Sequence, residues 1–305
     1  MNKHLHVFLG IVTLVAALLS IYGVHAVKLT VPLSQVLLRV GLPLIPLAIA
    51  WYYRWRRVEK LKNLFLFTFW GIALHNVHGL PFYIAARQKV DLQDALLADL
   101  DRRLGLEVPD VLRMMEHFPA LKVVLDVSYQ CLIILIILAI ALPVLCDRLA
   151  AVQEYFVACV VSVVIAIPLF ATFQAVGPWH YYGYAPDEEQ ERTTRIFFAL
   201  KSDEWIPMDA SNSAGVVAFP SFHTILAVLS AVALWSIPYV RYVAALLACL
   251  IVVSTVTTGW HYLADVLAGL GIAALSLAAA RGYSWLLGQP GTARTQAQCA
   301  PSDTR

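Results

Sequence analysis

Charged residues are scarce in this chain. Asp, Glu, Lys and Arg make up 14% of its 305 residues, whereas 60% are hydrophobic. Soluble domains are about a quarter charged, so this composition excludes an ordinary soluble protein. The formal net charge is only +2 and no dense basic patch occurs, which argues against a nucleic-acid partner. The hydrophobic residues gather in blocks of about 20, the length that crosses a bilayer as a helix.

Clusters of metal ligands are also lacking. The five cysteines fall mostly inside apolar blocks and show no metal-ligand spacing, so we expect them to be small buried hydrophobic residues. No group of carboxylates suggests a metal either. The sequence therefore predicts no metal ion and no other cofactor.

Eight apolar blocks are expected to be transmembrane helices, because backbone in lipid must satisfy its own hydrogen bonds. The predicted fold is an all-α polytopic membrane bundle, with two additional helices in 1–61, a six-helix core in 62–285 and a disordered cytoplasmic tail in 286–305. The first block is interpreted as a retained helix, with a cleaved signal peptide as the alternative. The eight blocks are 5–24, 31–53, 62–85, 121–145, 151–175, 221–237, 240–258 and 261–281.

Basic residues predict the orientation of the bundle. The connection between the second and third blocks carries five of them against one acid, which marks it as cytoplasmic. Counting alternately from there puts both termini in the cytoplasm and segments 86–120 and 176–220 outside. Leucines at helical spacing in 86–120 predict an amphipathic helix on the membrane surface, acting as a packed cap or as a substrate gate.

A first motif lies at the start of the last block, where Gly259 precedes Trp260, His261 and, four residues after His261, Asp265. Residues four apart share a helix face. A carboxylate there can accept a hydrogen bond from one imidazole nitrogen and leave the other nitrogen's lone pair free. A nucleophilic side chain is commonly oriented by a neighbouring group in this way. An aspartate inside a membrane helix also usually has a function.

A second motif opens the sixth block with Pro220, Ser221 and His223. Proline suits the first turn of a helix, and the free N–H groups of that turn favour an anion. The chain crosses the membrane twice between His223 and His261, so both histidines are expected at the same external depth. Two histidines, a carboxylate and an anion-friendly helix start are what phosphoryl transfer through a phosphohistidine requires.

With these motifs the chain resembles the type-2 phosphatidic acid phosphatase superfamily of membrane lipid phosphatases and phosphotransferases. That family is similar in its Pro-Ser-x-His and His-x3-Asp signatures, and the resemblance covers about residues 62–281. It implies that His261 is the nucleophile, that Asp265 orients it, that His223 is the general acid and that Ser221 contacts phosphate.

Two cationic residues of the usual phosphatase pattern are missing from this sequence. No Lys or Arg stands in 174–181, where a Lys-x6-Arg-Pro signature is usual, and Thr255 stands where an Arg is usual. These departures resemble the inositol phosphorylceramide synthase branch, which has a pair like Pro178-Trp179 and a run like 257–262. That branch implies transfer of a phosphorylated head group from a phospholipid donor to a lipid or alcohol acceptor.

Substrate contacts are expected from a further set of polar and aromatic residues, some of them beside the missing cations and some near the outer end of the third block. The predicted substrate-binding residues are Ser221, His180, Trp179, Gln174, His75 and His78. The cations considered as replacements for the missing ligands are His180, Arg192, Arg195, Lys201, Arg87 and Lys89.

Two other functions are also compatible with these residues. A lipid phosphate phosphatase, acting on a phosphatidate-like or isoprenyl phosphate monoester, shares every catalytic residue with the transferase. A non-catalytic lipid-binding or transport bundle is the second alternative, because intramembrane histidine and aspartate also occur as proton relays. The sequence leaves the identity of the donor, that of the acceptor and the oligomeric state open.

Overall fold

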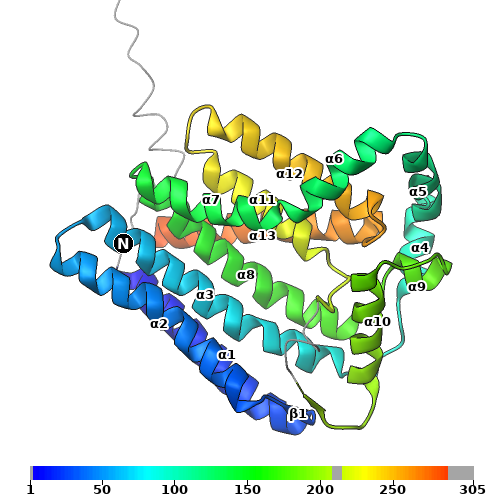
Figure 1. The fold of residues 1–305 in the computed structure, drawn as a ribbon, viewed down its shortest axis with the longest axis horizontal. Coiled ribbons are helices and arrows are strands. Elements are labelled where there is room, and N and C mark those ends of the chain that lie inside the picture. The colour runs from blue at the N-terminus through cyan, green and yellow to red at the C-terminus, as the bar shows by residue number, and fades with distance from the viewer. Residues whose placement is uncertain (1–2, 208–214, 288–305) are drawn as a thin grey trace, which may run out of the picture.

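The computed structural model describes residues 3–207 and 215–287. Within them the chain forms helices α1 to α13 and one pair of two-residue strands (Figure 1). The predicted all-α polytopic bundle is confirmed. The tail predicted for 286–305 lies outside the described residues, apart from its first two positions.

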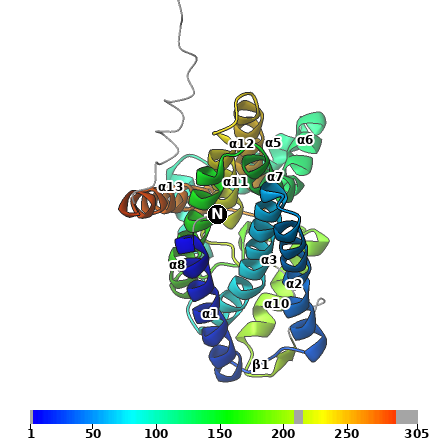
Figure 2. The ribbon, with the colours of Figure 1, turned by 90° about the vertical axis from the view of Figure 1, so that its left-hand side faces the viewer.

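The first three helices form one side of the bundle. α1 (Lys3–Ala26) and α2 (Leu33–Trp55) both pack on α3 (Glu59–Ala86), as Figures 1 and 2 show. Between α1 and α2, strand β1 (Leu29–Thr30) pairs in parallel with β2 (Ile206–Pro207). This short ladder ties the α1–α2 connection to a segment that is distant in sequence.

The centre of the remaining bundle is α11 (Phe222–Leu234), which contacts α7, α8, α12 and α13. The bounds of these neighbours are Leu132–Leu145 for α7, Leu149–Thr172 for α8, Val240–Thr257 for α12 and Leu263–Leu286 for α13. Buried side chains of α11 such as Ile225, Leu229 and Leu234 form the middle of the main hydrophobic core. Four helices therefore pack against the helix whose first turn carries His223.

Within the described residues, α1, α2, α8, α12 and α13 are long and apolar enough to cross a membrane, and α6 with α7 gives a sixth span if that bent pair is one. The protein is an integral membrane protein. Helices occupy all eight predicted positions, but α3 and α11 do not pass this test. With 13 residues, α11 is about 20 Å long, shorter than a hydrocarbon core of about 30 Å. At least one end of α11 is thus expected below the membrane surface.

The fourth predicted block is not one straight helix. α6 (Pro119–Gln130) and α7 meet at Cys131 with a bend of 49°. No proline or glycine marks this break in the sequence. The Cys131 N–H donates a hydrogen bond to the Ser128 carbonyl three residues back, and the Ser128 hydroxyl donates one to the Val124 carbonyl. Hydrogen bonds of these two kinds tighten and bend helices.

Segment 86–120 contains two short helices, where one amphipathic helix was expected. α4 (Asp94–Arg103) is the predicted helix, and α5 (Val108–Glu116) follows it. Gly105, with φ of +78°, ends α4: its N–H bonds the Arg102 carbonyl, and the Leu106 N–H bonds the Asp101 carbonyl. This pair of bonds is a Schellman motif, which favours glycine at the left-handed position.

The second long connection also contains helices, α9 (Pro178–Tyr182) and α10 (Glu188–Lys201). In Figure 1, α4, α5, α9 and α10 gather at one end of the bundle, together with the starts of α11 and α13. The N-terminus, the end of α13 and the basic α2–α3 turn lie at the opposite end. The alternation expected from the sequence is consistent with this arrangement, and the side that each end faces stays a prediction.

Candidate active site

The start of α13 brings His261 and Asp265 together. Nδ1 of His261 lies 3.3 Å from Oδ2 of Asp265, and the same carboxylate oxygen accepts the Tyr262 N–H at 2.9 Å. His261 is 3% exposed and Asp265 is fully buried. Because an ionised carboxylate only accepts, this contact favours a proton on Nδ1, and the His261 ring also makes a hydrogen bond with the Ala218 backbone.

The loop before His261 has one conformation that only glycine fits well. Gly259 has φ of +74°, and a Cβ there would lie 2.6 Å from the Tyr184 hydroxyl. That hydroxyl donates to the Gly259 carbonyl at 2.7 Å. Next to it, Trp260 packs edge-on against Trp179, with ring centroids 5.2 Å apart. Tyr184 and Trp179, both from the connection between α8 and α11, therefore fix the loop that carries His261.

The start of α11 is locked onto α13. The Ser221 N–H donates to the Asp265 carbonyl at 3.1 Å. Gly269 makes this approach possible, because a Cβ there would lie 2.7 Å from the Ser221 carbonyl oxygen. Ser221 is the N-cap of α11, and its hydroxyl accepts from the Thr224 N–H and the Thr224 hydroxyl. His223 lies in the first turn that follows.

This lock places His223 beside His261. Their ring centroids are 6.2 Å apart, with the planes inclined by 56°. Tyr129, at the α6–α7 bend, stacks on His223 with centroids 4.5 Å apart and planes inclined by 15°. This separation places the two imidazoles close enough to act on one bound group.

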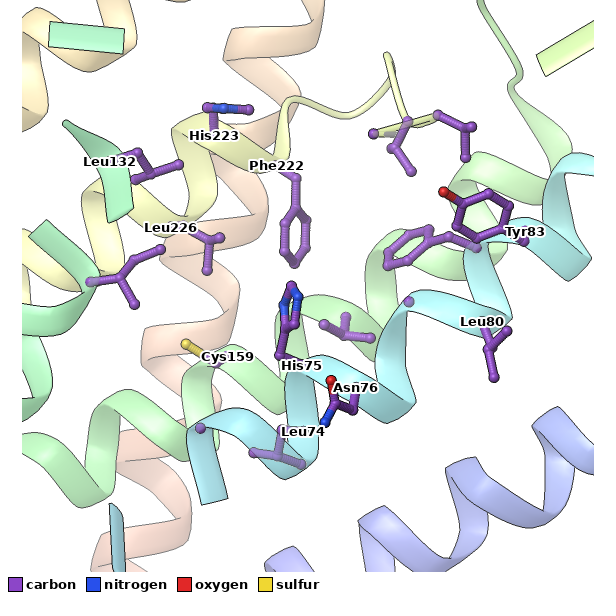
Figure 3. A pocket seen from close by; sticks show the side chains of 18 of the residues that line it. Leu74, His75, Asn76, Leu80, Tyr83, Leu132, Cys159, Phe222, His223 and Leu226 are labelled. Atoms are coloured by element: carbon purple, nitrogen blue, oxygen red, sulfur yellow. The ribbon is translucent and has the colours of Figure 1, made fainter. Parts of the chain in front are cut away.

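Both histidines line a cavity of about 1170 Å³. Ligand pockets usually measure about 300 to 1,000 Å³, so this one is large. Much of its wall is apolar and comes from α3, α7, α8 and α11, as Figure 3 shows with Leu74, Leu132, Phe222 and Leu226. The arrangement suits a substrate with a long apolar part and a reactive group held at the two histidines.

The predicted substrate-binding residues divide into two groups. His75 lines the cavity and points toward Phe222 (Figure 3), whereas the side chain of His78 is outside the described residues. Ser221 is fully buried and engaged with Thr224, and His180 packs beside Phe198 on the outer surface. Neither belongs to the described cavity wall.

Trp179 and Gln174 are buried behind the site. The Trp179 indole N–H donates to the Thr194 hydroxyl at 2.8 Å. The Gln174 amide donates to the Ala85 carbonyl at 2.8 Å and accepts from Lys201. Burial lowers the pKa of Lys201 to about 8. In the part of the chain that the structure describes, these side chains support the wall without lining it.

Arg39 is a wall residue that the sequence reasoning missed. It is the sole lysine or arginine among the described residues of the cavity wall, and the six cations considered from the sequence lie elsewhere. The Arg39 guanidinium donates to the Asn76 carbonyl at 3.0 Å, and the Asn76 amide donates to the Arg39 carbonyl at 2.9 Å. The signal was available, because a single charge inside an apolar block is costly and usually functional.

A comparison with protein families now adds to this geometry. The model of the PAP2 superfamily matches residues 95–279. The chain belongs to the PAP2 superfamily. The match begins inside α4 and includes both histidine motifs, and it leaves out α1, α2 and α3. Comparison with curated proteins and with solved structures gives no match.

Membership in the PAP2 superfamily fits a lipid phosphatase or phosphotransferase. It does not distinguish the inositol phosphorylceramide synthase branch from the others. Within 3–207 and 215–287, no three His, Cys, Asp or Glu side chains gather as metal ligands do. The expectation of a reaction without metal or cofactor stays a prediction.

Proposed function

We propose that this PAP2 superfamily protein is a lipid phosphotransferase that works through a phosphohistidine on His261. It moves a phosphate or a phosphorylated head group from a phospholipid donor to a lipid or alcohol acceptor. The observation that supports this most is the pair of imidazoles, 6.2 Å apart between centroids, on the wall of a largely apolar cavity of about 1170 Å³.

In the first step, Nε2 of His261 attacks phosphorus and the bond from phosphorus to the leaving oxygen breaks. His223, initially protonated, gives its proton to that oxygen. Asp265, 3.3 Å from Nδ1, stabilises the positive charge that develops on His261. Tyr129 stacks on His223 and holds its ring in place.

In the second step, the acceptor hydroxyl gives its proton to His223, and its oxygen attacks the phosphohistidine. The bond between phosphorus and Nε2 breaks, and neutral His261 is restored. Water in the acceptor's place makes the same residues a phosphatase. The missing Lys and Arg of the phosphatase pattern and the resemblance to the synthase branch favour transfer.

Arg39 is proposed as a cationic ligand for the phosphorylated group or for an anionic head group. It lies six residues inside α2, about 9 Å along the helix axis. Among the described residues it has no carboxylate within ion-pair distance. Its guanidinium has five N–H donors, so donors remain for a bound anion.

Product analysis tests this function. Purified protein is incubated in mixed micelles with phosphatidate, phosphatidylinositol and other phospholipids, with and without diacylglycerol and ceramide as acceptors, and the products are identified by mass spectrometry. A phosphorylated acceptor is the expected product. Release of inorganic phosphate with no transfer supports the phosphatase instead, and no turnover of any donor supports a binding or transport protein.

A further inference from the structure

The buried face of α4 carries two carboxylates. Asp94 is 4% exposed and Asp101 is fully buried, and the two residues are seven apart, which puts them on one side of the helix. A carboxylate removed from water is costly unless hydrogen bonds compensate for it. The partners of these two side chains therefore show what α4 is built to hold.

Asp101 holds the first turn of α13. Its Oδ2 accepts the Leu263 N–H and its Oδ1 accepts the Ala264 N–H, each at 2.8 Å. With the Tyr262 N–H on Asp265, these bonds satisfy donors that a helix start leaves free. Burial raises the pKa of the Asp101 carboxyl, and the two backbone N–H groups act in the opposite direction.

Asp94 joins two other parts of the site. It accepts the Val176 N–H at 3.0 Å and the Gly177 N–H at 2.9 Å, in the segment that leads to Trp179. Its Oδ1 also accepts the Tyr262 hydroxyl at 3.0 Å. Tyr262 is the neighbour of His261 and is fully buried.

His261 is consequently held on both sides along the chain. Trp260 before it packs on Trp179, and Tyr262 after it is bonded to Asp94. The helix start that carries Asp265 is fixed by Asp101. A small shift at any of these points moves His261 relative to Asp265 and His223, and a misplacement of about 1 Å can lower a rate about 10²-fold.

We propose that Asp94 and Asp101 are positioning residues that hold His261 and Asp265 in their reactive arrangement. The inference rests on the proposed role of His261 as nucleophile. It gives the external helix α4 a function beyond covering the bundle, because its two buried carboxylates bind the backbone around the reacting group.

The test separates the rate of phosphohistidine formation from the amount of folded protein. Phosphatidate and phosphatidylinositol, each radiolabelled at phosphorus, are mixed rapidly with wild type, Asp101→Asn and Asp94→Asn in mixed micelles. Labelled protein is then quantified over time. We expect the rate to fall about 10- to 100-fold in both variants, with the final amplitude and KM changed less than about threefold. A role in folding alone lowers the amplitude and leaves the rate unchanged, and that result overturns the inference.

Asp99→Asn is the matched control. It removes the same charge from the same helix, but the Asp99 side chain is 38% exposed and pairs with Arg102 and Arg103. We expect its rate to equal that of wild type. Equal rates in Asp99→Asn and Asp101→Asn contradict the proposal.

If an aspartate variant does not fold, a milder variant still tests the proposal. Tyr262→Phe removes only the hydroxyl that Asp94 accepts, and we expect it to slow labelling several-fold with the amplitude retained. An unchanged rate there overturns the part of the role of Asp94 that acts through Tyr262, and an unchanged rate in Asp94→Asn overturns the whole of it. If wild type forms no labelled histidine, the proposed function fails and the inference fails with it. If wild type is labelled and the α4 variants match it, the inference fails alone.

Discussion

The imidazoles of His223 and His261 lie 6.2 Å apart between ring centroids, although α11 and α12 separate them in the chain. The lock between the Ser221 N–H and the Asp265 carbonyl produces this closeness, and Gly269 provides the room for it.

Replacing His261, the proposed nucleophile, is expected to remove nearly all turnover. His261→Asn keeps a polar side chain of similar size but has no ring nitrogen for attack. We expect a loss of at least about 10³-fold in kcat, with the melting temperature close to that of wild type. His117→Ala, on the exposed end of α5, is the control and should keep full activity. Substantial turnover by His261→Asn assigns the nucleophile elsewhere.

The proposed acid is tested through the leaving group. His223→Asn should lower turnover of a lipid phosphate about 10²- to 10⁴-fold, the usual contribution of general acid catalysis. A substrate with para-nitrophenol as leaving group needs no protonation, so its loss should be much smaller. Equal losses for the two substrates argue that His223 serves another purpose.

Stacking on His223 is expected to need the ring of Tyr129 and not its hydroxyl. The centroids are 4.5 Å apart, and aromatic pairs contribute about 0.5 to 1.5 kcal/mol. Tyr129→Phe should keep near wild-type kcat, whereas Tyr129→Ala should lower it up to about tenfold, as 1.4 kcal/mol implies. Steady-state kinetics of the two variants measure kcat. A large loss of kcat in Tyr129→Phe indicates that the hydroxyl is needed instead.

Arg39 is expected to affect binding of the donor lipid. Arg39→Gln should raise KM for an anionic phospholipid about 10-fold or more, since hydrogen bonds to charged groups contribute about 1.5 to 3 kcal/mol. Arg39→Lys keeps the charge, so its KM should lie between those of wild type and Arg39→Gln. Arg54→Gln, at the exposed far end of α2, serves as the control. An unchanged KM in Arg39→Gln removes this residue from the site.

Gly259 is expected to be essential to the stability of the loop before His261. Gly259→Ala forces a side chain into φ of +74° and within 2.6 Å of the Tyr184 hydroxyl, so we expect a loss of about 1 to 3 kcal/mol. Gly282→Ala is the matched change in open space on α13 and should stabilise the protein slightly. Thermal unfolding in detergent gives the melting temperatures of the two variants. Similar melting temperatures for Gly259→Ala and Gly282→Ala contradict the expectation that a side chain at position 259 is strained.

The sequence predicts the parts of the site that depend on local pattern. The spacing of His261 and Asp265 predicted their contact, and two antiparallel spans between the motifs predicted that His223 lies near His261. Arg39 was also detectable as a charge inside an apolar block, but its place in the cavity depends on the packing of α2 on α3.

Long-range contacts explain what the sequence does not show. Asp101 binds the N–H groups of Leu263 and Ala264, which are far away in the chain, and nothing local in α4 indicates them. Ser221 follows the expected motif, but it is fully buried and its hydroxyl oxygen accepts two hydrogen bonds from Thr224. Tyr129 reaches His223 because of a bend at Cys131 that no proline or glycine marks.

Trapping the phosphorylated enzyme tests the central claim most directly. Wild-type protein is incubated with phosphatidate and phosphatidylinositol radiolabelled at phosphorus, quenched in alkali, which preserves phosphohistidine, and mapped by peptide mass spectrometry. The account predicts label on His261, present in wild type and in His117→Ala and lost in His261→Asn. Turnover with no label on His261, or with label on another residue, contradicts it.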